Sequence, residues 1–321
     1  MTRHFIIDCD PGSDDVIALL MALRAPDVTI DLITTVSGNV PVTMGTLNTL
    51  HTLALFGADV PVYVGADRPL VREPEYAFFY HGADGLGGQH LPAPRRQPEA
   101  AHASDALIAG IRANPGLTLV TLGPLTNLAL AIARAPEIVA DVGRCVMMGG
   151  TAGSGGNVTP AAEFNIWADP EAAQRVFTSG LLLEMVGWEL CRGEAAINAA
   201  EIEQLRALDT PLAHFVLASN RTAIAYSQHE YGEPSMALAD PVAMAIALDP
   251  VICTHSSAEH VLVETQSALT RGMTVIDALN VGGEERNLPV WGSLVAGAPN
   301  VTVCWEIDIP RWKAMCFDAL A

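Results

Sequence analysis

The chain has little positive charge. Lys and Arg number 17 in its 321 residues, against 36 Asp and Glu, and the formal net charge is −19 at pH 7. An acidic surface repels the phosphates of nucleic acid polymers and of anionic membranes, so we expect neither as a partner. The same surface is compatible with a small neutral ligand, which carries no charge to repel.

Several other features are missing. No apolar run approaches the length of a membrane span, and the first strand-like run follows the N-terminus without the pattern of a signal peptide. The six cysteines are scattered, mostly in apolar runs, which is typical of reduced core residues in a cytoplasmic protein. Because no linker, low-complexity run or internal repeat divides the chain, we expect a single domain over residues 1–321.

The sequence does have a regular alternation of apolar strand-like runs with helical ones. Strands are expected near 4–9, 28–36, 60–64, 117–122, 143–148, 181–187, 260–264 and 300–306. Helices are expected near 13–25, 41–56, 101–113, 124–135, 170–179, 199–208, 211–229, 240–248 and 309–318. This alternation indicates an α/β fold of Rossmann-like type, with a mostly parallel central sheet and helices on both faces. Ligands bind such sheets at the carboxyl ends of the strands, where the polar clusters of this chain fall.

The densest polar cluster runs from Asp8 to Asp15 and reads Asp-Cys-Asp-Pro-Gly-Ser-Asp-Asp. It joins a strand-like run to a helical run, and Ser13 is the expected N-cap of that helix. Its four aspartates fall within eight residues, so their carboxylates repel one another. A bound cation would relieve this repulsion far more than a helix N-terminus does.

The ligand type indicates which cation. Carboxylates without a His or Cys set at zinc spacing favour Ca²⁺ or Mg²⁺ over Zn²⁺. An EF-hand counted from Asp8 does not fit, because its sixth position would be Ser13 and its twelfth Leu19. A P-loop does not fit either, because no Gly-Lys-Ser/Thr follows the strand. The plain alternative is an acidic turn that is merely solvated.

Further segments accompany this motif along the chain. They are Ser37-Gly38-Asn39, His81-Gly82-Ala83-Asp84-Gly85-Leu86-Gly87, Leu122-Gly123-Pro124-Leu125-Thr126-Asn127, a glycine-rich loop with Asn157, Ala162-Glu163-Phe164-Asn165-Ile166-Trp167-Ala168-Asp169-Pro170, and Ala239-Asp240-Pro241. Together with the pattern Asp-x-Asp-Pro-Gly-x-Asp-Asp, they resemble the inosine–uridine preferring nucleoside hydrolase family. The resemblance implies the nucleoside hydrolase fold and an enzyme that hydrolyses ribonucleosides.

The resemblance also implies which residues form the site. A Ca²⁺ ion would be held by Asp10, Asp15, Asp240 and the backbone carbonyl of Leu122. Asp10 is also the expected general base, and Asp8 is expected to support the metal site from behind. The substrate would be bound by Asp14, Asn39, Met148, Asn157, Glu163 and Asn165, mainly through the ribose.

Some of these segments also allow an interpretation from spacing. Glu163 and Asn165 are two apart in a stretch expected to be extended, so both would point the same way, toward a ribose diol. Asp169 and Pro170 form an N-cap and first-turn pair and are expected to be structural. Asn127 is expected to tie loops together.

The sequence departs from the family pattern at two positions. Many relatives carry a His immediately before the last metal-binding Asp, where it protonates the departing base, and some purine-preferring relatives carry a Trp. This chain has Ala239, which can do neither. Cys9 stands where well-known members carry Thr or another small residue, and we expect it to pack under the turn. The chain therefore resembles a divergent branch of the family.

Three routes remain for the departing base. His81 or His229 could donate a proton, since both lie in segments that lead to the site. The base could instead be held by Tyr226, Tyr231 or the 81–87 loop, or the natural substrate could carry a base that leaves without acid help. We favour His81 with aromatic assistance.

The predicted function is the calcium-dependent hydrolysis of the N-glycosidic bond of purine or pyrimidine ribonucleosides of the inosine/uridine type, by a homodimer or homotetramer. Buried partners for the sugar hydroxyls predict strictness for ribose over 2′-deoxyribose. One alternative is a ribonucleoside-binding pseudoenzyme, as Ala239 would allow. The other is a metal-dependent phosphatase with an aspartate nucleophile. That class predicts Thr or Val where Gly12 stands and a downstream Lys, and the chain has few lysines.

Overall fold

The structure is a computed structural model and describes residues 2–89, 91–292 and 297–321. In these segments an eight-stranded sheet has the order β3-β2-β1-β4-β5-β6-β10-β7. Its strands are β1 (Arg3–Cys9), β2 (Val28–Thr35), β3 (Val62–Val64), β4 (Leu117–Thr121), β5 (Val142–Met148), β6 (Leu183–Val186), β7 (Cys253–Glu259) and β10 (Val301–Ile307). Only β7 runs antiparallel to its neighbour among these strands. The predicted mostly parallel sheet is confirmed.

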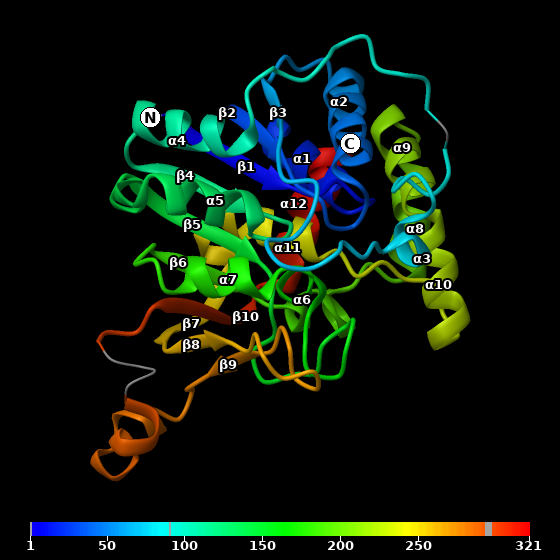
Figure 1. The fold of residues 1–321 in the computed structure, drawn as a ribbon. Coiled ribbons are helices and arrows are strands. Elements are labelled where there is room, and N and C mark those ends of the chain that lie inside the picture. The colour runs from blue at the N-terminus through cyan, green and yellow to red at the C-terminus, as the bar shows by residue number, and fades with distance from the viewer. Residues whose placement is uncertain (1, 90, 293–296) are drawn as a thin grey trace.

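Helices cover both faces of the sheet, as predicted (Figure 1). One face packs against α1 (Asp15–Arg24), α2 (Val42–Phe56), α11 (Ala239–Leu248) and α12 (Ile309–Leu320). The other face packs against α4 (Ala103–Ala113), α5 (Thr126–Arg134) and α7 (Pro170–Phe177). Each layer has its own buried apolar cluster, so the sheet is buried on both sides, which explains why its strands read as continuous apolar runs.

A third group of helices lies beyond the carboxyl end of the sheet (Figure 1). It consists of α3 (Phe78–His81), α8 (Ala199–Ala207), α9 (Pro211–Ser219) and α10 (Arg221–Tyr231), with the short α6 (Phe164–Ala168) nearby. The tips of β1, β2, β4 and β5 face this group, because parallel strands end at one edge. The fold therefore leaves the polar segments that follow these strands between the sheet and the helices.

Several predicted boundaries were wrong for physical reasons. The helix expected at 211–229 is two helices, and the break falls at Asn220, whose Nδ2 donates to the carbonyl oxygens of Ser13 and Val216. The strand expected at 260–264 is β8 (Val261–Val263), which pairs with the unpredicted β9 (Thr274–Ile276) in a small separate sheet. The helix break depends on a tertiary contact, and the small sheet depends on the pairing of two short strands. Neither can be read from the local sequence pattern.

Two local predictions at the site were also wrong. Ser13 is not the N-cap of α1, because Asp14 holds that position and the Ser13 hydroxyl faces His81 instead. Glu163 and Asn165 are not in an extended segment, because Glu163 is the N-cap of α6 and Asn165 lies inside this helix. The prediction for Asp169 is confirmed, since its carboxylate caps α7 and Pro170 opens that helix.

No helix within residues 2–89, 91–292 and 297–321 is both long and apolar enough to cross a membrane. The six cysteines all lie in these segments and are free, and Cys9 is buried beneath the acidic turn as expected.

Candidate active site

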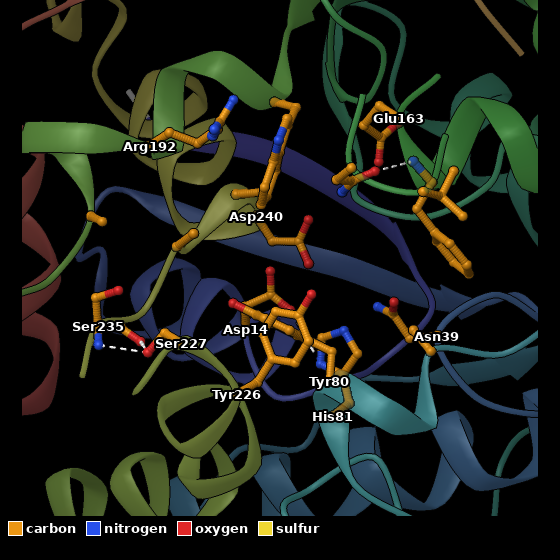
Figure 2. Close-up of a pocket in the computed structure, with 18 of the residues that line it drawn as sticks. Asp14, Asn39, Tyr80, His81, Glu163, Arg192, Tyr226, Ser227, Ser235 and Asp240 are labelled. Carbon is orange, nitrogen blue, oxygen red and sulfur yellow. Dashed lines mark hydrogen bonds and ion pairs between the residues drawn. The ribbon is translucent and has the colours of Figure 1, made fainter. Parts of the chain in front are cut away.

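A cavity of about 570 Å³ opens at the carboxyl end of the sheet. Its floor comes from segments that follow β1, β2, β4 and β5 and from the start of α11, and its walls come from α3, α6 and α10. Figure 2 shows side chains of this lining. The sites predicted from separate parts of the sequence therefore converge on one place. The lining includes Asp14, Asn39, His81, Leu122, Met148, Asn157, Glu163, Asn165, Tyr226, Tyr231, Ala239 and Asp240.

Carboxylates gather at the base of this cavity. Asp14, Asp15 and Asp240 each place an oxygen so that the three oxygens lie within 4.8 Å of one another. Asp10 is fully buried beside them, and its Oδ2 accepts a hydrogen bond of 2.6 Å from the backbone N–H of Asn39. Within the described chain, Oδ1 of Asp10 and Oδ1 of Asp14 are buried without a hydrogen-bond donor. Such oxygens lack compensation for their burial.

Burial and mutual repulsion raise the pKa values of this cluster. Burial, with the charge of Asp15 next in importance, raises the pKa of Asp10 well above its ordinary value, and Asp240 behaves in the same way. The pKa of Asp15 rises to about 7, first through burial and then through Asp14. Because the donors are all oxygens and some have no partner, the cluster fits a hard divalent cation. A cation would supply the missing partners and offset the repulsion.

Two glycines make room for Asp10. A Cβ on Gly38 would lie 2.0 Å from Oδ2 of Asp10, and a Cβ on Gly123 would lie 2.6 Å from Oδ1. Both distances are far shorter than any real contact, so a side chain at either position would displace this carboxylate. The glycines that look like simple turn residues in the sequence therefore hold the acid in place.

Asp8 lies behind the cluster at the end of β1. Its Oδ1 accepts hydrogen bonds from Oγ1 of Thr34 at 2.5 Å and from Nδ2 of Asn127 at 2.8 Å. Burial raises its pKa to about 7, although both bonds oppose the change. Asn127 also donates to the carbonyl of Thr35 and accepts from the backbone N–H of Ala66, so it ties loops together as predicted.

Asn165 connects two of the predicted ligands. Its Nδ2 donates to the carbonyl oxygen of Leu122 at 2.7 Å and approaches the carbonyl oxygen of Met148 at 3.3 Å. The Sδ atom of Met148 lies 3.2 Å from the same nitrogen. The amide of Asn165 therefore fixes the orientation of the Leu122 carbonyl beside the acidic cluster.

Glu163 is held by the backbone around it. Its Oε1 accepts from the backbone N–H of Asn165, and its Oε2 accepts from the N–H of Gly150 and of Ile166, with distances of 2.8, 2.8 and 3.3 Å. Burial raises its pKa to about 7. Asn157 supports the same helix, because its Oδ1 accepts from the N–H of Phe164 at 2.9 Å. This wall is rigid and presents carboxylate and amide groups to the cavity.

His81 is bound to the acidic turn through Nδ1. This atom accepts from the backbone N–H of Ser13 at 3.1 Å and lies 2.9 Å from the Ser13 hydroxyl. A Cβ on Gly12 would meet the same nitrogen at 2.7 Å. Burial lowers the pKa of His81, although the charge of Asp14 opposes the effect. Since Nδ1 accepts the Ser13 N–H, the ring tautomer that fits this contact carries its proton on Nε2.

An aromatic wall faces the acidic cluster. The ring of Tyr226 lies 5.6 Å from the rings of Phe79 and Tyr80 and 6.5 Å from that of Tyr231, centre to centre. Tyr80 lies beside Tyr226 (Figure 2) and is partly exposed, and desolvation of its phenol, followed by the charge of Asp14, raises its pKa. Tyr231 is 73% exposed and lies at the mouth. The two predicted tyrosines thus line the cavity, and Tyr80 joins them.

One predicted residue does not reach the cavity. The side chain of His229 is 86% exposed, and its Nδ1 pairs with Oε1 of Glu230 at 2.9 Å. It lies one helical turn beyond Tyr226, near the C-terminal end of α10, where its side chain projects into solvent.

The sequence reasoning also missed residues of the wall. They include Tyr80, Trp188, Arg192, Ser227 and Ser235. Tyr80 directly precedes His81, and Trp188 and Arg192 follow the carboxyl end of β6, so position after a strand was the signal that could have found them.

The chain was compared with known proteins. A family model described as inosine-uridine preferring nucleoside hydrolase matches residues 5–314. The chain is 42% identical to a protein of Shewanella sp. (strain ANA-3) named pyrimidine-specific ribonucleoside hydrolase RihA, over 100% of this chain and 97% of that protein. A protein of the same name from Salmonella agona (strain SL483) is 40% identical, over 96% of this chain and 95% of its own length.

Solved structures show the same relation. A plant nucleoside hydrolase is 33% identical and superposes with a TM-score of 0.92, over 100% of this chain and 99% of that chain. A purine-preferring ribonucleoside hydrolase from Gardnerella vaginalis is 29% identical with a TM-score of 0.88, over 99% and 98% of the two chains.

Proposed function

Because the chain belongs to the inosine–uridine preferring nucleoside hydrolase family, we propose that it is a calcium-dependent enzyme that hydrolyses ribonucleosides to free base and ribose. One observation carries the proposal. Buried carboxylates with unpartnered oxygens lie at the floor of a cavity whose walls hold an ordered carboxylate and amides.

The residues proposed to hold the cation are Asp10, Asp15, Asp240 and the carbonyl of Leu122. Asp14 lies in the same cluster of oxygens and is proposed to reach both the cation and the sugar. When bound, a divalent cation would supply a positive charge that makes a nearby water more acidic and lowers the pKa values of the surrounding carboxylates. Ca²⁺ suits an irregular set of carboxylate and carbonyl oxygens.

Asp10 is the proposed general base. Its Oδ2 is fixed by the backbone N–H of Asn39, whereas its buried Oδ1 accepts no hydrogen bond from the described residues. Oδ1 is therefore free to take a proton from the attacking water, and the glycines at 38 and 123 leave the space that this carboxylate occupies. Asp8 is proposed to hold this turn from behind through Thr34 and Asn127.

The ribose is proposed to lie against Asp14, Asn39, Glu163 and Asn165, with Met148 and Asn157 beside them. Glu163 already accepts three backbone hydrogen bonds, so its oxygens are oriented before the substrate arrives. Buried groups of this kind lose their partner when a hydroxyl is missing, which should exclude 2′-deoxyribonucleosides.

The role predicted for His81, donating a proton to the departing base, stays a prediction; because Nδ1 of His81 is bound to the acidic turn, we propose that it acts first from the sugar side. Its Nδ1 is occupied by Ser13, so only Nε2–H remains to donate into the cavity. Tyr226 and Tyr231, together with Tyr80, are proposed to pack against the base or cover it. Pyrimidine ribonucleosides are the substrates we propose first, because the relatives that cover nearly the whole chain at 40–42% identity are named for them.

Assembly and location are also proposals. We propose a single domain that forms a homodimer or homotetramer, which light scattering would test. Six free cysteines suit a reducing compartment such as the cytoplasm.

The decisive experiment is a turnover assay with uridine, cytidine, inosine and adenosine, before and after treatment with EGTA. We expect release of free base from at least uridine, its loss in EGTA, and its recovery with added Ca²⁺. Binding without turnover would instead identify a pseudoenzyme. Stoichiometric zinc in protein prepared without chelator, or full activity after exhaustive chelation, would contradict the calcium assignment.

A further inference from the structure

Arg192 carries a positive charge into a cavity that is otherwise acidic. Among the described residues that line the cavity, it is the one Lys or Arg, whereas Asp14, Glu163, Glu233 and Asp240 line the same space. It follows β6 at the end of a short 3₁₀ helix, Trp188–Cys191. In Figure 2, Asp240 lies between Arg192 above and His81 below. The guanidinium of Arg192 thus lies across the cavity from His81 and its contact with Ser13.

The charge of Arg192 is only weakly used within the protein, where it opposes the rise that burial causes in the pKa of Glu189. Other arginines form close pairs, such as Arg144 with Glu184 and Arg311 with Asp249. Arg192 forms no ion pair with any described residue, and its guanidinium carbon lies 5.9 Å from the centre of the Trp188 ring. The nearby carboxylate of Glu189 faces the loop at 152–154 instead, where it accepts from Ala152 N and Ser154 Oγ.

Ser227 and Ala239 offer the base no free donor on this wall. The hydroxyl of Ser227 lies 2.9 Å from the carbonyl oxygens of Ile224 and Ser235 and accepts from the N–H of Ser235 at 2.8 Å. Ala239 offers only a methyl group beside Asp240. The tyrosine hydroxyls of the lining are neutral donors, whereas the N–H groups of Arg192 carry a positive charge.

The reaction itself creates the charge that Arg192 would meet. When the bond between C1′ and the base nitrogen breaks, its electron pair goes to the base, while the water oxygen bonds to C1′ and the water proton goes to Asp10. In a pyrimidine the negative charge spreads from N1 to the ring carbonyl oxygens. A donor aimed at developing charge stabilises the transition state more than the ground state.

We propose that Arg192, held by the face of Trp188, binds the departing base and stabilises its negative charge. This inference rests on the proposed ribonucleoside hydrolysis and adds the substrate class, namely nucleosides whose base leaves as an anion with a carbonyl oxygen next to the glycosidic nitrogen. The planar guanidinium offers paired N–H groups that suit such an acceptor, and the indole limits its freedom. The base afterwards takes its proton from solvent at the open mouth.

The test compares leaving groups in matched variants. Arg192→Gln removes the charge, Arg192→Lys keeps it without the planar fork, and Arg206→Gln removes an exposed arginine of α8 as the control. Substrates are uridine, 5-fluorouridine with its more acidic base, and p-nitrophenyl riboside, whose leaving group is stable as an anion. We expect Arg192→Gln to lower kcat/KM by about 10²-fold on uridine. The loss should be smaller on 5-fluorouridine and least on p-nitrophenyl riboside.

Arg192→Lys should recover part of the loss, and Arg206→Gln should match the wild type. An equal loss on all three substrates would show that Arg192 only shapes the cavity, and an unchanged rate on uridine would remove it from the reaction. Both results overturn this inference while leaving ribonucleoside hydrolysis intact. If the wild type released no base from any ribonucleoside, the proposed function itself would fail. Melting curves of each variant establish that it is folded.

Discussion

The floor of the cavity is made by turns that directly follow sheet strands, whereas the opposite wall is made by side chains of short helices. On the floor, Asp10, Asp15 and Asp240 are buried, and backbone groups orient Asp10 and Asp15. On the wall, Tyr231 is largely exposed, and Arg192 is exposed and rests on a single ring. The floor cannot change without disturbing the sheet, while the wall can be altered residue by residue.

This difference suggests a division of work. In the proposed function, the floor and the α6 side would meet the parts that every ribonucleoside has in common, the sugar and the glycosidic carbon. The helical wall would meet the base, which differs from one substrate to another. Changes on the floor should then affect all substrates alike, and changes on the wall should depend on the leaving group.

Substitutions of Asp10 should have the largest effect and test the role proposed for the floor. Asp10→Ala should remove nearly all turnover on every substrate, because a proposed cation ligand and the base are lost together. Asp10→Asn keeps an oxygen for the cation and should retain part of the metal affinity, but it cannot accept the proton. Steady-state kinetics and calcium titration would measure both. Wild-type kcat in Asp10→Asn would show that another group is the base.

Substitution of His81 should give the next largest loss of rate. The substrates on which the rate falls would show whether His81 acts with the floor or with the wall. Because its Nδ1 supports the turn at Ser13, we expect His81→Ala to slow uridine and p-nitrophenyl riboside by similar factors, about 10²-fold. His229→Ala is the matched control, and its exposed position predicts no change. A loss confined to uridine would instead identify His81 as the acid that protonates the base. His81 would then be assigned to the base-binding wall and not to the floor.

The sugar side should give a smaller, uniform loss. Glu163→Gln and Asn165→Ala should each weaken transition-state binding by about 1–3 kcal/mol, the usual effect of losing a hydrogen bond to a buried group. The loss should be the same for uridine and cytidine, since the base is not involved. The wild type should in addition discriminate strongly against 2′-deoxyuridine. Equal rates on uridine and 2′-deoxyuridine would end the argument for diol recognition.

The smallest effect concerns stability and pH. Asp8, Asp15 and Glu163 have pKa values raised by burial to about 7, so the folded state keeps protons that the unfolded state releases at lower pH. The stability of metal-free protein should therefore be greatest in mild acid and fall as pH rises toward and through about 7. Melting temperatures of metal-free protein across this pH range would measure the change. In Asp8→Asn, the melting temperature should depend less steeply on pH. Metal-free protein that becomes more stable over this range would refute the expectation.

The floor could be predicted from the sequence because its signals are local. Two aspartates at a strand end, a Pro-Gly turn and two more aspartates lie within eight residues, and the carboxyl ends of parallel strands must meet. The alternation of apolar runs predicted the seven parallel strands of the sheet and most helices for the same reason, but it missed the antiparallel edge strand β7. Where these rules applied, the expected strands and helices agree with the structure to within a few residues at most ends.

The wall could not be predicted, because tertiary contacts decide it. Asn220 breaks the helix expected at 211–229 through a bond to Ser13, and the resulting α10 brings Tyr226 to the cavity but leaves His229, one turn further on, in solvent. Arg192 looks like an ordinary surface residue until the cavity shows what it faces. Likewise, only packing shows that Glu163 caps a helix, since the residues around it are compatible with an extended segment.

The bond from Asn220 to Ser13, between residues 207 apart, also bears on how the protein is made. The acidic turn leaves the ribosome long before Asp240 and the helices of the wall. Until these have followed, the turn has neither the third member of its oxygen cluster nor the Asn220 bond. A nascent chain can thus pair β1 with β2 well before it can act, and the enzyme gains its activity only when the segment around Asp240 has emerged.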